Sequence, residues 1–403
     1  MAMNPVSIYT LTSALHDEAS VSRITDGFLA DIFPDGGYDL AGGDFSAFGS
    51  GTLDLIFVRT GGTEGIFRSL LPELADRGIR RFHLLTSGKS NSLAASLEIL
   101  SYLRQNGFEG EVIHGQTAYV RRRIMELSKV TEVRETLRGT CLGVIGRPSD
   151  WLIASGTDYK AVYEQLGIWL EDIPMEELLD ELSSVRCTEP LPDKPLSDAV
   201  RTAFPGAVEI YEALKRMIAN HNLNGLTIRC FDLLTAVGNT GCLALARLNA
   251  QGIPAGCEGD IPALLSMTVA RAVAGVSGFQ ANPSLIDTET GEMVFAHCTV
   301  PLDMVTSYDY DTHFESGIGV GIRGRFEVGP VTVFKLSGDL KRHFAAEGVL
   351  TGNLAEPDLC RTQVTLRLDP ADARYFLTDP VGNHHIIIPG HHKAVLDEIL
   401  RAE

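Results

Sequence analysis

The chain has 403 residues, a length that suggests two or three domains with sizeable buried cores. Its hydrophobic content of 44% and charged content of 21%, with 40 glycines, are ordinary for a soluble α/β protein. The formal net charge of −18 argues against a nucleic-acid or anionic-membrane partner, because both select for a basic surface.

The seven cysteines are widely spaced, and no two of them are separated by only two residues. This spacing excludes zinc ribbons and thioredoxin-like motifs, so buried, reduced thiols in a cytoplasmic protein are expected. The N-terminus has no basic region followed by an apolar run, so it is not a signal peptide. No apolar run is long enough to predict a membrane span.

Strands and helices alternate through the first third of the chain, which predicts βαβ units and a mostly parallel sheet. The expected strands cover residues 6–14, 53–59, 82–86, 111–114 and 140–145. The expected helices cover residues 17–32, 93–105 and 117–137, with another beginning after Glu64.

A second α/β block is expected from about residue 146. Strands are expected at residues 166–170 and 227–230 and in a short run that ends at Glu258, followed by two more strands before residue 300. Helices are expected at residues 196–219, 242–250 and 262–274. The proline-rich residues 190–195 are expected to be a linker or an excursion.

Beyond Pro301 the pattern changes to short alternating runs separated by Gly and Asp turns, which predicts a mostly β region. Strands are expected at residues 318–322, 331–336, 363–368 and 385–388, and a closing helix at 394–401. The sequence therefore predicts three domains: residues 1–145, residues 146–300 carrying Glu258 and His297, and residues 301–403 carrying His384.

Three glycine-rich motifs do not support a nucleotide site. Gly88-Lys89-Ser90 ends like a phosphate-binding loop, but His83 stands where the first glycine is required, so Ser90 or Asn91 is expected to cap a helix. Residues 319–324 match GxGxxG but precede strand-like sequence rather than a helix. Residues 60–64 are expected to form a tight turn. Its role is either to cap the following helix through Thr63 or to contact the substrate.

Carboxylates and histidines follow several strands in the second half of the chain. The candidate metal ligands are Glu258, Asp260, Asp287, His297, His313, His384 and His385, with His391 and His392 further on. Mixed carboxylate and imidazole ligands suit Mn²⁺, Fe²⁺, Co²⁺ or Mg²⁺. His384 and His385 are adjacent before an apolar strand, so at most one of them is expected to face a given site.

Several of these motifs together resemble the L-fucose isomerase / L-arabinose isomerase superfamily, and in particular its shorter members. The motifs are residues 257–263 (CEGDIPA), 296–298 (AHC), 382–384 (GNH) and 389–391 (PGH), with the earlier residues 60–64 and 91–95. The resemblance implies an α/β fold of two Rossmann-like parallel-sheet domains followed by a mostly β C-terminal domain. It also implies a homo-oligomer, a trimer or hexamer.

The resemblance implies aldose–ketose isomerisation of a monosaccharide through a cis-enediol, with Mn²⁺ or another divalent cation. Glu258 matches a carboxylate that is both metal ligand and base, and His384 and His297 match ligand histidines. Similar enzymes have an Asp 24 residues after the Glu, where this chain has Asn282. An amide oxygen can bind a metal, but Asn cannot act as a base at neutral pH.

Three interpretations follow from the altered position. In the first, Glu258 is the main base, and Asp287, Asp260 or a metal-bound water assists it. In the second, the enzyme isomerises an anionic sugar, such as a sulfo-sugar or sugar phosphate. In the third, the chain is a non-catalytic sugar-binding homologue. Arg229, Arg323 or Arg361 could hold an anionic tail through two hydrogen bonds. The residues expected to contact substrate are Arg229, Asn91, Thr63, His385 and Arg361.

Overall fold

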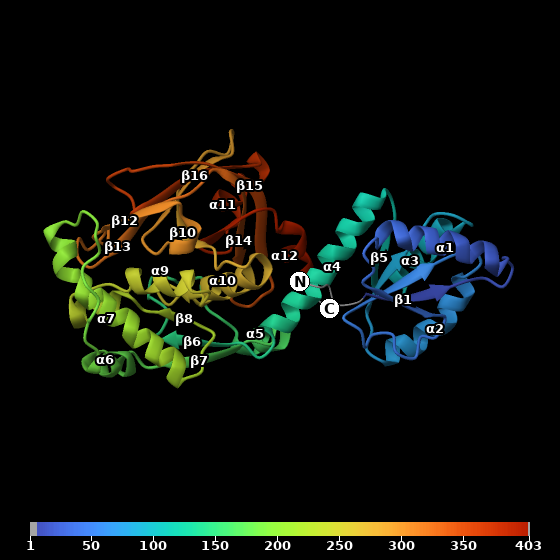
Figure 1. Cartoon of the computed structure of the whole chain (residues 1–403), viewed down its shortest axis with the longest axis horizontal. Helices are drawn as coiled ribbons and strands as arrows, with labels where there is room; N and C mark the ends of the chain where they lie inside the picture. The colour runs from blue at the N-terminus through green and yellow to red at the C-terminus, as the bar shows by residue number, and fades with distance from the viewer. Residues whose placement is uncertain (1–5, 402–403) are drawn as a thin grey trace. The chain divides into compact units, whose positions relative to one another are not determined.

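The computed structural model describes residues 6–401, which form two compact units (Figure 1). The first comprises residues 6–132 with Arg401, and the second comprises residues 133–400. The division into three domains at residues 145 and 300 stays a prediction. Among residues 6–401, no helix combines the length and apolar character needed to cross a membrane.

The first unit is built on a five-stranded parallel sheet with the order β2-β1-β3-β4-β5. Its strands are β1 (Val6–Leu11), β2 (Tyr38–Gly42), β3 (Leu53–Val58), β4 (Arg81–Leu85) and β5 (Glu109–Ile113). The helices are α1 (Glu18–Ile32), α2 (Glu64–Asp76), α3 (Ser92–Gln105) and α4 (Thr117–Leu137), the last of which continues into the second unit. Strands such as β1 and β3 are almost wholly buried, as expected for a parallel sheet with helices on its faces.

A carboxylate on β5 lies in a network of positively charged groups. Glu111 accepts hydrogen bonds from Arg123 on α4 at 2.7 and 2.9 Å and contacts His83 Nδ1 on β4 at 2.9 Å. Burial alone would raise the pKa of Glu111, but the hydrogen bonds and charges of His83 and Arg123 outweigh it and lower the pKa to about 2. The ion pairs thus stabilise the folded chain at neutral pH.

Replacing Glu111 by glutamine is expected to lower the free energy of unfolding by about 1–3 kcal/mol at pH 7. Because the folded-state pKa is depressed, this contribution is present above pH 4.5 and is lost as the pH falls to about 2. Urea unfolding of the full chain, followed by circular dichroism at a series of pH values, measures the difference. Glu98→Gln, an exposed change in the same unit, is the matched control, and a pH-independent difference would contradict the prediction.

The second unit contains a four-stranded parallel sheet with the order β7-β6-β8-β9. Its strands are β6 (Cys141–Ile145), β7 (Trp169–Ile173), β8 (Gly225–Ile228) and β9 (Ala255–Gly256). The accompanying helices are α5 (Tyr159–Leu166), α6 (Met175–Ser184), α7 (Asp198–Asn220), α8 (Phe231–Val237), α9 (Cys242–Ala250) and α10 (Ile261–Ala274).

Six further strands of the second unit form a closed antiparallel barrel with the order β10-β11-β16-β15-β14-β17. These strands are β10 (Phe279–Ile286), β11 (Glu292–His297), β14 (Gly329–Leu336), β15 (His343–Asn353), β16 (Thr362–Leu368) and β17 (His385–Pro389). A short helical turn, η1 (Leu302–Met304), and a hairpin of β12 (Ser307–Asp311) and β13 (Gly321–Arg325) follow β11. Helices α11 (Pro370–Thr378) and α12 (Lys393–Ile399) complete the unit.

Helix α10 joins the parallel sheet to the barrel, because it contacts β8 and β9 on one side and β14 and β17 on the other. Residues 261–270 of this helix are all buried. A helix that is apolar on every face belongs in the interior of a protein. The helix therefore lies between the end of β9 and the barrel strands.

The predicted fold class is confirmed: two parallel sheets precede a mostly β C-terminal region. Several local predictions are wrong. Leu166 ends α5 rather than beginning a strand, because Gly167 takes a left-handed conformation (φ 68°) that ends the helix, and the strand follows at β7. The strand predicted at 318–322 lies at β13, and β9 stops at Gly256, before Glu258.

Candidate functional site

The chain reverses sharply at the carboxyl end of β9. Glu258 has a φ of 64°, which is rare for a residue with a side chain, and Gly259 follows with a φ of 67°. A Cβ at Gly259 would lie 2.6 Å from the backbone oxygen of Arg147, so glycine is required there. The Ser149 backbone N–H donates to the Glu258 carbonyl oxygen at 3.0 Å. The loop is therefore fixed, and such strained positions are concentrated at functional sites.

Two histidines of the barrel face Glu258. His297 is the last residue of β11, and its Nε2 lies 3.8 Å from Glu258 Oε1. His384 directly precedes β17, and its Nε2 lies 3.5 Å from the same oxygen. The candidate ligand atoms of the three residues all lie within 4.8 Å of one another, so they could hold a metal ion.

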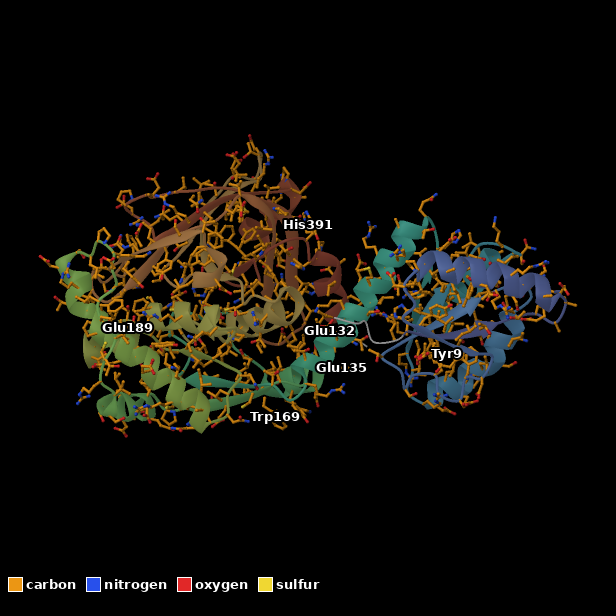
Figure 2. All side chains as sticks on the ribbon, viewed as in Figure 1. Tyr9, Glu132, Glu135, Trp169, Glu189 and His391 are labelled. Atoms are coloured by element: carbon orange, nitrogen blue, oxygen red, sulfur yellow. The ribbon has the colours of Figure 1, made fainter. Side chains whose placement is uncertain are left out.

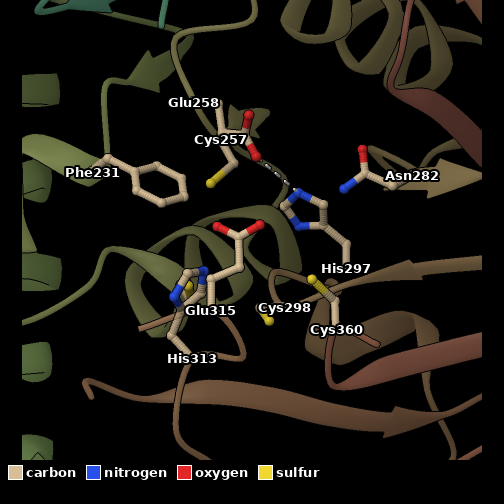
Figure 3. A pocket seen from close by; sticks show the side chains of 10 residues that line it. Phe231, Cys257, Glu258, Asn282, His297, Cys298, His313, Glu315 and Cys360 are labelled. Atoms are coloured by element: carbon tan, nitrogen blue, oxygen red, sulfur yellow. Dashed lines mark ion pairs between the residues drawn. The ribbon is translucent and has the colours of Figure 1, made fainter. Parts of the chain in front are cut away.

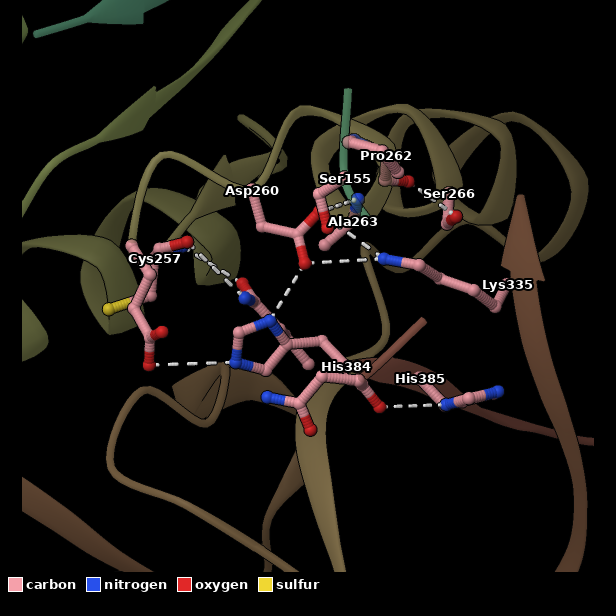
Figure 4. A network of polar contacts seen from close by, with 12 residues as sticks. Ser155, Cys257, Asp260, Pro262, Ala263, Ser266, Lys335, His384 and His385 are labelled. Carbon is pink, nitrogen blue, oxygen red and sulfur yellow. Dashed lines mark hydrogen bonds and ion pairs between the residues drawn. The ribbon is translucent and has the colours of Figure 1, made fainter. Parts of the chain in front are cut away.

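The orientation of both imidazole rings is fixed by hydrogen bonds at Nδ1. His384 Nδ1 lies 2.8 Å from Asp260 Oδ2, and His297 Nδ1 lies 2.9 Å from the Thr299 hydroxyl (Figure 4 shows the first). An ionised carboxylate can only accept hydrogen bonds. Nδ1 of His384 therefore carries a proton and donates a hydrogen bond to Asp260. A histidine held in this way offers Nε2 as a metal ligand.

Asp260 is itself held on several sides. It is completely buried, caps α10 by accepting from the Ala263 N–H at 2.8 Å, and pairs with the buried Lys335 Nζ on β14 at 3.2 Å (Figure 4). Burial alone would raise the pKa of Asp260, but the Lys335 charge and the His384 hydrogen bond hold it well below its usual range. Asp260 thus positions His384 and is not available as a base.

The structure contains two buried polar atoms that fit a metal at this place. His384 Nε2 and Asn282 Oδ1 have no hydrogen-bond partner among the described residues. Buried polar atoms without partners are rare in folded proteins. One carboxylate, two imidazoles and an amide oxygen suit Mn²⁺ and similar divalent ions, and these four ligands leave positions of an octahedral ion open for substrate.

Glu258 and His297 line a small pocket together with Asn282 (Figure 3), whereas His384 contacts Glu258 without being one of the lining residues. The pocket volume of about 20 Å³ matches a single ion or water molecule, so a sugar would lie across the open mouth. The remaining lining residues are Phe231, Cys242, Cys257, Cys298, His313, Glu315 and Cys360. All seven cysteines of the chain are free thiols, and four of them are buried, whereas Cys141, Cys187 and Cys360 are only partly buried.

An aromatic wall borders the carboxylate. The indole N–H of Trp151 donates to Glu258 Oε2 at 2.7 Å, and the Trp151 ring packs edge-to-face against Phe231 at 4.9 Å between centroids. Trp151 is half exposed, so much of its ring faces solvent next to Glu258.

Replacing Trp151 by phenylalanine is expected to keep the aromatic wall but remove the hydrogen bond to Glu258. We expect the affinity for Mn²⁺ to fall by about 10-fold, since partners of metal ligands typically contribute that much. Isothermal titration with Mn²⁺ measures the change. Trp169→Phe, on the half-exposed strand β7, is the control, and equal affinities in the two variants would contradict this role for Trp151.

The structure does not bring all predicted site residues to the pocket. Asp287 lies in the turn after β10, where its carboxylate accepts from the N–H groups of Glu289 and Thr290. It is five residues, or roughly 16 Å of extended chain, beyond Asn282. His385 faces away from the pocket, where Tyr375 and Phe376 contact its ring. Burial lowers the pKa of His385 to about 3, so this imidazole is neutral.

The predicted arginines are near the site but already paired. Arg229 binds Asp150 and Asp232 at 2.8 and 3.0 Å, and Arg361 binds Asp311 at 3.5 Å and donates to the Thr312 carbonyl. His391 lies on the surface, 3.2 Å from Glu347 (Figure 2).

Thr63 and Asn91 belong to the first unit. Thr63 precedes α2, and its hydroxyl donates to the Thr60 carbonyl at 3.1 Å. Asn91 precedes α3 in a left-handed conformation, without a side-chain capping bond. Their roles as substrate contacts stay predictions.

Sequence reasoning missed Trp151, which donates to Glu258, and Glu315, which lines the pocket. Trp151 lies in a loop of the second unit, 107 positions before its partner, and no periodic pattern marks it. Glu315 lies two residues after His313, which was among the candidate ligands, and a carboxylate so close to a candidate histidine was the available signal.

Comparison with known proteins gives distant relatives of one kind, and no family model matches the chain. It is 24% identical over 266 residues to the sulfoquinovose isomerase of Alkalicoccus urumqiensis, covering 61% of this chain and 59% of that protein. It is 24% identical over 236 residues to that of Clostridium sp. (strain MSTE9), covering 56% and 49%. It is 23% identical over 278 residues to that of Priestia megaterium, covering 64% and 60%.

The aligned region thus spans only half to three fifths of the length of these relatives. At this identity the comparison supports a relation to sugar isomerases. It does not show membership of the L-fucose isomerase / L-arabinose isomerase superfamily, which stays a resemblance.

Proposed function

We propose that the protein is a metal-dependent aldose–ketose isomerase and that its substrate is a sulfo-sugar of the sulfoquinovose type. The observation that carries the proposal is the convergence of Glu258, His297 and His384 within 4.8 Å. The sulfoquinovose isomerases among the relatives support the substrate class, which is one of the anionic sugars anticipated from Asn282.

A divalent cation such as Mn²⁺, when bound here, would polarise the sugar carbonyl and stabilise the negative charge that develops on oxygen. Glu258, His297 and His384 would hold it, with the Asn282 amide oxygen as a further ligand. Asp260 and Thr299 fix the imidazole rings of His384 and His297. The Nε2 atoms of the two histidines are therefore already oriented before the metal ion binds.

The exposed face of Trp151 provides an apolar surface beside Glu258 on which a sugar ring can lie, and its N–H fixes the carboxylate. The sulfonate needs a cation. Arg229 supplies one at the end of β8, because its partner Asp150 has a side chain that is 71% exposed and can be displaced by a sulfonate at little cost. We further propose that the protein is a homo-oligomer, that it is located in the cytoplasm and that its physiological metal is Mn²⁺.

The test is an assay of the full chain with Mn²⁺ in deuterated buffer, using sulfoquinovose, a sugar phosphate and neutral aldoses. Nuclear magnetic resonance detects ketose formation and deuterium at C2 of the recovered aldose. We expect turnover of sulfoquinovose that is abolished by a chelator. Turnover of neutral sugars alone would remove the sulfo-sugar from the proposal, whereas sugar binding without turnover of any kind would identify a non-catalytic binding protein.

A further inference from the structure

The proposed isomerisation needs a group that moves a proton between two carbon atoms of the sugar. Position 282, where similar enzymes have a second carboxylate, is occupied by Asn282, which cannot take up a proton at neutral pH. The following inference rests on the proposed function and concerns the group that replaces the missing carboxylate.

The carboxylates already discussed are committed to other contacts. Asp260 uses its oxygens on Lys335, His384 and the Ala263 N–H, and Asp287 holds the turn after β10. One oxygen of Glu258 accepts from Trp151, and the other faces the two imidazoles. Glu258 is therefore positioned to hold the metal ion rather than to carry a proton from one atom to another.

Glu315 is a different carboxylate that lines the same pocket. Its side chain points into the pocket between Phe231 and His297 (Figure 3). The residue is exposed at the mouth, and the structure gives its carboxylate no hydrogen bond or ion pair among residues 6–401. A free carboxylate at the mouth can reach a sugar that lies over the metal group.

The loop that carries Glu315 is held in place on both sides. The His313 N–H donates to the Ile318 carbonyl and the Gly317 N–H donates to the His313 carbonyl, both at 2.9 Å. Gly319 has a φ of 71° and packs so closely that a Cβ would lie 2.4 Å from the Thr240 hydroxyl. Backbone contacts thus fix the loop while the Glu315 side chain stays free to move.

We propose that Glu315 is a catalytic residue that transfers the proton from C2 to C1 of the sugar. Its carboxylate takes the proton from C2, the electrons of the broken C2–H bond form the C1=C2 double bond, and O1 takes up the negative charge. The same carboxyl group then returns the proton to C1. The proton on O2 passes to O1, which leaves the C2 carbonyl of the ketose, so atoms and electrons balance.

The test compares Glu315→Gln with wild-type protein and with Glu327→Gln, a matched change at an exposed carboxylate outside this pocket. The measurements are kcat, KM, deuterium incorporation at C1 of the ketose, and Mn²⁺ affinity of the full chain. For Glu315→Gln we expect kcat and deuterium incorporation to fall together by at least about 100-fold, the usual contribution of an acid–base group. KM and Mn²⁺ affinity stay within about threefold, and Glu315→Asp regains part of kcat.

Retention of kcat within threefold in Glu315→Gln, while wild type is active, would overturn this role and leave the proposed function intact. A parallel loss of Mn²⁺ binding would also overturn it, because Glu315 would then hold the metal or the loop. If wild-type protein isomerises no sugar, the proposed function fails, and the role of Glu315 fails with it.

Discussion

Replacing Glu258 by glutamine is expected to lower the Mn²⁺ affinity by at least about 100-fold and to reduce isomerisation by at least about 1,000-fold. The amide has nearly the same shape, but it brings no negative charge to the group formed with His297 and His384, whose imidazoles lie 3.8 and 3.5 Å from the carboxylate. Because only charge is removed, the overall fold should persist.

Isothermal titration with Mn²⁺ and the deuterium-exchange assay measure the two effects, and circular dichroism checks the fold. Glu356→Gln, a change at an exposed residue of the second unit, is the matched control and should behave like wild type. Unchanged Mn²⁺ affinity in Glu258→Gln would show that the metal binds elsewhere, or that the carboxylate is not a ligand.

Replacing Lys335 by methionine is expected to lower the free energy of unfolding by about 3–5 kcal/mol, because it leaves the Asp260 carboxylate buried without its cation. Both side chains are almost completely inaccessible, at 1% and 0% exposure. The change should also lower Mn²⁺ affinity, since Asp260 orients His384.

Lys341→Met is the matched control, because Lys341 is 80% exposed and lies 3.8 Å from its partner Asp339. Such a surface pair contributes roughly 0–1 kcal/mol. Urea unfolding of both variants gives the comparison. A loss below about 1 kcal/mol in Lys335→Met would mean that the buried pair contributes no more than the surface pair, contrary to this account.

The three central residues of the site could be predicted because each lies at or next to the end of a strand. Glu258 follows β9, His297 ends β11 and His384 precedes β17. The alternation of strand side chains also explains why only His384 of the two adjacent histidines faces Glu258. That these strand ends meet depends on closure of the barrel, which pairs β10 with both β11 and β17 and has no local signal.

The rest of the site could not be predicted for physical reasons. Asp260 resembles a base in the sequence, but its partner Lys335 lies 75 positions away, and only their pairing shows that the carboxylate is structural. The register of β10 shifts between Pro283 and Leu285, so counting residues from Asn282 could not place Asp287. Glu315 lies in a turn, where no periodicity predicts the direction of a side chain.

The fold was predictable where strands were long and apolar, as in β3, or helices long and amphipathic, as in α7. The missed elements include β2, β12, β15, α5, α6, α8 and α11. The helices among them have 10 residues or fewer. The missed strand β15 has 11 residues and contains two glycines that interrupt its alternation, so tertiary pairing with β14 and β16 defines it.

We expect Glu258, His297 and His384 to hold one divalent ion. The most direct measurement is anomalous X-ray diffraction from crystals of the full chain grown with Mn²⁺. We expect one strong peak roughly 2 Å from Glu258 Oε1 and from Nε2 of both histidines, with the Asn282 amide oxygen in reach. A fully occupied Mn²⁺ site elsewhere in the chain, or no peak at these three residues at saturating Mn²⁺, would contradict the claim.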